Sequence, residues 1–215
     1  MADNLFETQY DITKKSKLIK LYEENKFILF SFILILIIIL GSFSFYLANK
    51  AKQKTLVSEN YIKAKIFLEN KNQAEAVRIL KDAIYADDSI YSPLSFFLLL
   101  DKKLIKDDQE LSNLFNQILS NDELDKELKD LLTYKKSLFN SAFVQESILL
   151  EEVKPLLNGE NLWKPHALLL LGDYFASKNE FKKAQEFYIQ IFSLKNINKD
   201  LYDETRSRLA LIKND

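Results

Sequence analysis

The longest apolar stretch of the chain lies near its start. Residues Phe27 to Asn49 carry no charged side chain, and Lys26 and Lys50 bound them. A helix of this length reaches about 34 Å, which is enough for the hydrocarbon core of a bilayer. The pattern predicts three parts: a cytoplasmic tail at 1–26, a transmembrane anchor at 27–49 and a soluble helical domain at 50–215.

Two other interpretations of this stretch are open. A core helix can be equally apolar, but a domain of this size rarely covers such a segment on every side. A cleaved signal peptide is the stronger alternative, because Ser42 and Ser44 offer small residues at a spacing suited to signal peptidase. Against it, the preceding tail is long and carries five acids, and the apolar run continues past the candidate cleavage site. We therefore favour an uncleaved anchor.

The lysines that flank the anchor bear on its orientation. On the N-terminal side they are Lys14, Lys15, Lys17, Lys20 and Lys26, and on the other side Lys50, Lys52, Lys54 and Lys63. Five against four is a small excess that favours a cytoplasmic N-terminus. A long charged tail is also not normally translocated ahead of its own anchor. The predicted topology places the N-terminus in the cytoplasm and residues 50–215 on the far side of the membrane.

Beyond the anchor, apolar residues recur at helical spacing. Val57, Tyr61, Ala64 and Leu68 form one helical face. Asn72 with Glu75, and Asp107 with Glu110, are capping-box pairs, and we also expect Asn121 and Asp122 to cap a helix. The predicted helices after the first are 72–86, 91–105, 107–119, 121–139, 144–158, 163–177, 181–194 and 199–213. The helix at 91–105 should be buried nearly all round, and Asn158-Gly159 should end its helix in the left-handed conformation.

Composition agrees with an all-α chain and narrows its function. Gly and Pro number three each, which argues against a turn-rich or all-β fold. Cysteine is absent, so disulfides, thiolate chemistry and cysteine zinc sites are excluded. After residue 49 there are 25 basic and 26 acidic residues, and this balance lacks the basic stripe that nucleic-acid binding needs.

The predicted helices recur in pairs. The midpoints of the second helices fall near Ala76, Leu111, Glu146 and Ala184, at nearly equal intervals. A period of about 34 residues made of two helices is the signature of the tetratricopeptide repeat. Its pattern is matched best between Pro165 and Asn196, by Leu168, Leu171, Gly172, Phe175, Ala184 and Tyr188, and it departs at Ile191 and Asn196. An earlier copy keeps Ala64, Phe67, Ala76, Leu80 and Ala83. The predicted fold is an α-α superhelix of tetratricopeptide-like hairpins.

With this architecture, the whole chain resembles the YfgM-like, single-pass tetratricopeptide proteins of bacterial inner membranes, described as ancillary subunits of the Sec translocon. The segment Asn4 to Glu7, followed by lysines and by Leu18 to Tyr22, is similar to that family's cytoplasmic tail. The segment Leu162 to Ala167, leading into Leu171-Gly172, resembles its last hairpin. The resemblance implies a periplasmic helical domain that works beside the translocon and periplasmic chaperones. It carries over no catalytic residues.

Candidate chemistry is sparse. His166, the single histidine, lacks companions at metal-ligand spacing, and we expect it to be a cap or a packed ring. Trp163 marks a helix start and is a possible binding anchor. The pairs Asp87-Asp88, Asp107-Asp108 and Glu151-Glu152 are expected to cap helices or face solvent. No Gly-rich phosphate loop or nucleophile elbow is present. We expect no catalytic, cofactor or metal site.

The sequence therefore predicts a membrane-tethered interaction module that binds proteins, with no bond made or broken and no small-molecule substrate. The leading hypothesis links exported chains, translocon subunits and periplasmic chaperones. Two alternatives stay open: a scaffold for cell-envelope assembly or cell division, and an enzyme or sensor with a hidden site. The partner, the groove face that binds it and the oligomeric state do not follow from the sequence.

Overall fold

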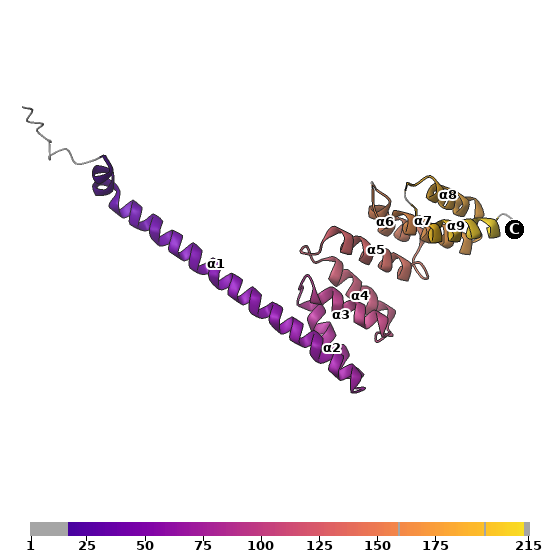
Figure 1. Cartoon of the computed structure of the whole chain (residues 1–215), viewed down its shortest axis with the longest axis horizontal. Helices are drawn as coiled ribbons and strands as arrows, with labels where there is room; N and C mark the ends of the chain where they lie inside the picture. The colour runs from indigo at the N-terminus through magenta and orange to yellow at the C-terminus, as the bar shows by residue number, and fades with distance from the viewer. Residues whose placement is uncertain (1–16, 159, 196, 213–215) are drawn as a thin grey trace, which may run out of the picture. The chain divides into compact units, whose positions relative to one another are not determined.

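A computed structural model describes residues 17–158, 160–195 and 197–212, and the regular elements among these residues are all helices. The tail predicted at 1–26 lies mostly outside them. The helices are α1 (Lys17–Glu69), α2 (Gln73–Tyr85), α3 (Tyr91–Asp101), α4 (Asp108–Leu119), α5 (Lys126–Asn140), α6 (Glu146–Leu157), α7 (Lys164–Ser177), α8 (Phe181–Phe192) and α9 (Lys199–Ile212) (Figure 1). The chain divides into two compact units, Met1–Leu56 and Val57–Asp215.

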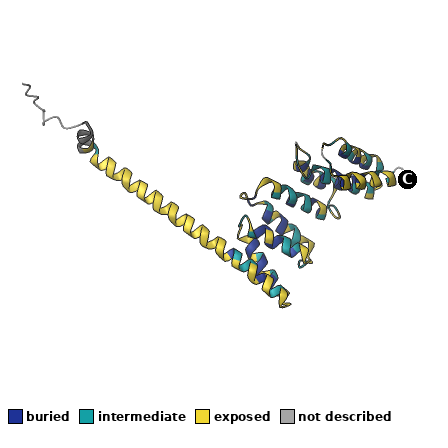
Figure 2. Cartoon of the chain, in the orientation of Figure 1, coloured by how far each residue is buried: buried dark blue, intermediate teal, exposed yellow. Residues whose placement is uncertain are grey.

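Helix α1 contains the apolar stretch. Its backbone leaves the α region at Asn25 (φ −122°, ψ 17°) and is helical beyond it. Residues 26–56 are exposed throughout, as Figure 2 shows, and none of the most apolar 18-residue window is buried. A core helix would be covered by the rest of the chain, so that interpretation is wrong. The segment is long and apolar enough to span a membrane.

The second unit has a core made from the facing sides of its helices. One cluster joins Ala64 to apolar residues of α2, α3, α4 and α5. The other joins residues of α6, α7, α8 and α9. Among α2 to α9, every pair of helices in contact is one or two apart in the chain. The core is therefore built by local stacking of successive helices.

Three helices end with the same turn, and each uses a residue other than glycine. Lys71, Lys103 and Asn179 have φ of 60°, 49° and 61°. Each is followed by an amide that donates back to the carbonyl five positions earlier, as Leu104 does to Leu99 at 3.0 Å. This Schellman geometry satisfies carbonyls that the helix end leaves unpaired. It stops α3 at Asp101, one turn before the predicted end at 105.

Other predicted ends and faces also need correction. The N-cap of α5 is Asp125, which accepts from the amide of Leu128 at 2.8 Å; the predicted caps Asn121 and Asp122 lie before it. Asn121 instead donates to the carbonyl of Asp87 at 2.7 Å. Leu94 is 40% exposed, so α3 is not buried all round. Asn158 is extended (φ −81°, ψ 134°), and Gly159 lies outside the described residues. The predicted caps Asn72 and Asp107 are confirmed.

The hairpin of α7 and α8 closes around Gly172. A Cβ built on Gly172 would lie 2.2 Å from Cε1 of the Tyr188 ring. Ala184 and Tyr188 on α8 are buried, and the ring of Phe175 stacks on that of Phe187 at 5.4 Å and 3°. The absent side chain at Gly172 is thus what lets the Tyr188 ring lie against α7.

We expect Gly172→Ala to destabilise the second unit by about 2 kcal/mol, because a rigid ring must move to admit the methyl group. For a unit of this size, that lowers the melting temperature by roughly 4–8 °C. Thermal unfolding of the full chain in detergent, followed by circular dichroism, measures it. Gly41→Ala is the matched control, since a Cβ there meets nothing within 4 Å. Equal melting temperatures for the two variants would contradict the prediction.

We expect Lys103→Gly to stabilise the fold by about 0.5–1 kcal/mol, because glycine adopts positive φ without the steric cost that a side chain carries. The neighbouring Lys102 has φ −84°, so Lys102→Gly removes the same charge without relieving strain and should give no gain. Urea unfolding of both variants, compared at the transition midpoint, decides the matter. If both variants are more stable than the original chain, the loss of the lysine charge explains the gain, and the relief of backbone strain at residue 103 does not.

Candidate functional site

Helix α7 contacts both α5 and α9, which do not contact each other in the described part of the chain. We call the side chains that these three helices bring together the α5–α7–α9 face. Its first part is a cluster of three rings. Tyr134 of α5 stacks on Trp163 at 5.5 Å and 19°, and His166 on the first turn of α7 lies 5.8 Å and 5.5 Å from these two rings. All three are half-buried, so the cluster is anchored yet open to a ligand.

The second part of the face is a network of charges centred on Asp173. Its Oδ1 accepts from the hydroxyl of Tyr188 at 2.7 Å, and its Oδ2 lies 3.6 Å from Nη2 of Arg208. The same guanidinium donates to Oε1 of Glu204 at 3.2 Å. The three charged side chains keep exposures of 34%, 44% and 48%, so water reaches them. One positive and two negative charges leave the network with a net negative charge.

The two parts influence each other electrostatically. Burial lowers the pKa of His166, and the carboxylate of Glu204 partly opposes this shift. Burial raises the pKa of Tyr134, and Glu204 and Asp173 raise it further. The pKa of Tyr188 is raised by burial and by its bond to Asp173. At neutral pH the rings are therefore uncharged and lie in the negative field of two carboxylates.

Such a face is suited to binding. Aromatic rings beside carboxylates attract cations and the edges of other rings. No group of three or more His, Cys, Asp or Glu in the described residues is placed to hold a metal ion.

The residues singled out from the sequence fall in several places. His166 and Trp163 meet in the ring cluster, so His166 is a packed ring. Asp88 accepts from the amides of Ile90 and Tyr91 at 2.9 Å and 2.7 Å, as a capping residue should. The expectation for Glu152 is wrong: it is 17% exposed and binds Asn140 at 2.7 Å and Lys136 at 3.1 Å. This polar cluster joins α5 to α6.

Tyr134, Asp173, Glu204 and Arg208 were not among the residues singled out from the sequence. They lie on three separate helices, and only the stacking of those helices brings them together. Local spacing offered one usable signal, since Glu204 and Arg208 are four apart on an exposed helix face, a common ion-pair spacing. Nothing local connects that pair to Trp163, which lies before α7 while the pair belongs to α9.

Comparisons with protein-family models, curated proteins and solved structures found no match to this chain. The structure itself defines an all-helical protein, over its described residues, with one helix that is long and apolar enough to span a membrane.

The titration of His166 tests the electrostatics of this face. Its folded pKa is lowered from the ordinary 6.5, so the unfolded chain takes up a proton first as the pH falls. The contribution of the neutral His166 ring to the free energy of unfolding should be complete above about pH 6.5. It should decline as the pH drops toward the pKa of His166 in the folded chain. Since the chain has one histidine, its ring proton signal in NMR reports the midpoint without ambiguity. Glu204→Gln should lower that midpoint further. A midpoint at or above the ordinary value would contradict this account.

Proposed function

We propose that this protein is a membrane-anchored interaction module that binds other proteins through the α5–α7–α9 face. The observation that carries the proposal is the half-buried ring cluster beside two accessible carboxylates. Rigid, half-exposed aromatic residues bury a large area at a small entropic cost, and they dominate binding energy at protein interfaces. The carboxylates favour a partner segment with a basic or amide-rich character.

Several features support a tetratricopeptide-like superhelix. Helices α2 to α9 stack by local contact, as repeat proteins do. Gly172 and Ala184 occupy the small-residue positions of that pattern, and Tyr188 fills the aromatic position four residues after Ala184, with its ring against Gly172. The earlier copy buries Ala64, Ala76, Leu80 and Ala83 completely. In such a superhelix the first helices of successive hairpins line one surface, which here is the α5–α7–α9 face.

The anchor and its orientation belong to the same proposal. The exposed apolar segment of α1 acts as an uncleaved anchor, with the N-terminus in the cytoplasm and residues 50–215 in the periplasm of a bacterium. This topology and the resemblance to YfgM-like proteins favour a role as an ancillary subunit at the Sec translocon, between exported chains and periplasmic chaperones. The anchor contains no ionisable Asp, Glu, Lys, Arg or His between Phe27 and Asn49, so it offers no intramembrane transport site. Tethering raises the local concentration of the binding face near membrane complexes.

Site-specific photo-crosslinking tests the proposal. A photoreactive residue at Leu162, which is 73% exposed and next to Trp163, should capture translocon subunits or exported chains in intact membranes. Trp163→Ala should reduce the yield at least fivefold, because the ring cluster supplies most of the contact. The exposed Lys182, on α8, is the control position for the same photoreactive residue and should capture neither class.

The outcomes separate the hypotheses. Capture of peptidoglycan enzymes or outer-membrane assembly factors would favour the envelope scaffold and overturn the translocon role. Equal capture from Leu162 and Lys182 would show that the α5–α7–α9 face is not the binding face. Protease accessibility of residues 50–215 in spheroplasts checks the orientation separately.

A further inference from the structure

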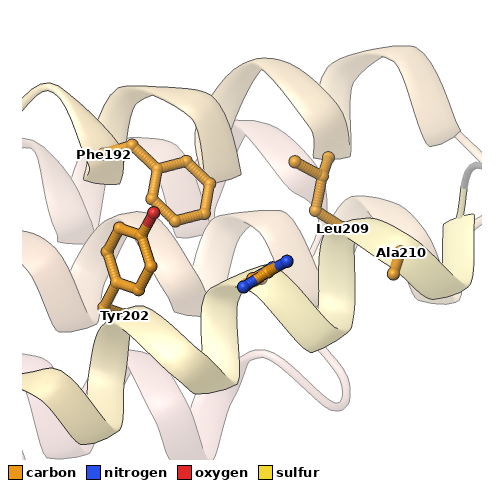
Figure 3. A pocket seen from close by; sticks show the side chains of 5 residues that line it. Phe192, Tyr202, Leu209 and Ala210 are labelled. Carbon is orange, nitrogen blue, oxygen red and sulfur yellow. The ribbon is translucent and has the colours of Figure 1, made fainter.

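The outer side of α9 carries a second, separate surface. Phe192 at the end of α8 and residues of α9 line an open hollow of about 340 Å³ (Figure 3). The α9 residues are Tyr202, Arg206, Leu209 and Ala210. The rings of Phe192 and Tyr202 meet edge to face at 4.9 Å. Four of the five lining residues are therefore apolar or aromatic, and Arg206 is the charged exception.

Aligning α9 on α7 relates this surface to the interior of the α7–α8 hairpin. In that alignment, buried Leu201 and Thr205 of α9 correspond to buried Ala167 and Leu171 of α7, so the two helices face the preceding hairpin alike. The same alignment matches the four lining residues of α9 with four residues of α7. The pairs are Tyr202 with Leu168, Arg206 with Gly172, Leu209 with Phe175, and Ala210 with Ala176. The hollow is thus the counterpart of the α7 surface that α8 covers.

In the α7–α8 hairpin that surface is covered closely. The Tyr188 ring lies against Gly172, and Phe187 stacks on Phe175. On α9, three of the four counterparts are exposed within the described residues, namely Tyr202 (45%), Arg206 and Ala210, and Leu209 is partly buried against the core. By the alignment of α9 with α7, the hollow lies where one more helix would pack.

We propose that this hollow on α8 and α9 binds an amphipathic helix of another protein, with an acidic residue placed opposite Arg206. The apolar part of the hollow takes the ridge of such a helix, in the helix-in-groove mode. Arg206 has no ion-pair partner among the described residues. An acidic residue on the bound helix supplies that partner. It lies at the position that Tyr188 occupies over Gly172 in the α7–α8 hairpin.

Charge also favours a different protein over a second copy of this chain docked by two-fold symmetry. Arg206 is at the middle of the lining face, between Tyr202 and Ala210. A second copy docked by two-fold symmetry around that centre would place Arg206 against its own counterpart, and like charges at such a contact repel. An acidic helix removes the conflict. This surface is distinct from the α5–α7–α9 face, so the proposal stands or falls independently of the function proposed above.

The chain supplies its own probe. A labelled peptide of residues 180–194 reproduces α8, the helix that covers the counterpart surface. In it, Tyr188→Glu places an acid over Arg206, and Tyr188→Lys is the matched peptide of opposite charge. Fluorescence anisotropy with the full chain in detergent should show the acidic peptide binding at least tenfold more tightly than the basic one.

Variants of the full chain complete the test. Arg206→Glu should invert the preference between the two peptides, while Lys182→Glu, with the same change of charge at the far end of α8, should leave it unaltered. Circular dichroism establishes that each variant is folded. The proposal is overturned if both peptides bind equally, if binding is absent, or if Arg206→Glu leaves the preference unchanged. It is also overturned if light scattering shows a dimer that Leu209→Asp dissociates, since the occupant is then a second copy.

Discussion

The contact of Tyr188 with Gly172 is the constraint on which the packing of α7 with α8 depends. Because no side chain projects from Gly172, the ring of Tyr188 lies against α7, and its hydroxyl reaches Asp173 at the next position along. Asp173 in turn faces Arg208 of α9. One missing methyl group thereby lets contacts from α8 and α9 converge on Asp173 of α7. It also fixes one carboxylate oxygen, so that the other is directed at the neighbouring helix.

The charge network and the ring cluster lie on the same face but contribute differently to the stability of the fold. The rings gain stability from apolar area and from one another, and the same burial makes the histidine among them resist protonation. The charges are accessible and contribute little to stability, as exposed ion pairs generally do. Glu204 and Arg208 are exposed and can exchange their ion pair for other charged groups at small cost to the fold, whereas Asp173 also accepts from the hydroxyl of Tyr188.

The sequence was sufficient for the features that depend on local periodicity and chemistry. The capping pairs at Asn72 and Asp107, the apolar segment of α1 and the small residue Gly172 were all identifiable from spacing. Turns that depend on backbone strain were not. Nothing in the type of Lys103 marks it as a residue with positive φ, so α3 was expected to continue. Glu152 was assigned to solvent because its partners, Asn140 and Lys136, lie on another helix.

The stacking pattern has a consequence for the order in which the domain folds. Each helix from α2 to α9 packs on helices one or two positions away, so no contact among them waits for a distant part of the chain. Chains with such local topology fold quickly, and they can gain structure progressively as they emerge during synthesis. Helix α9 contacts α7 and α8 and buries Leu201 in the core that they share, so α9 has a surface to pack on once α7 and α8 have paired.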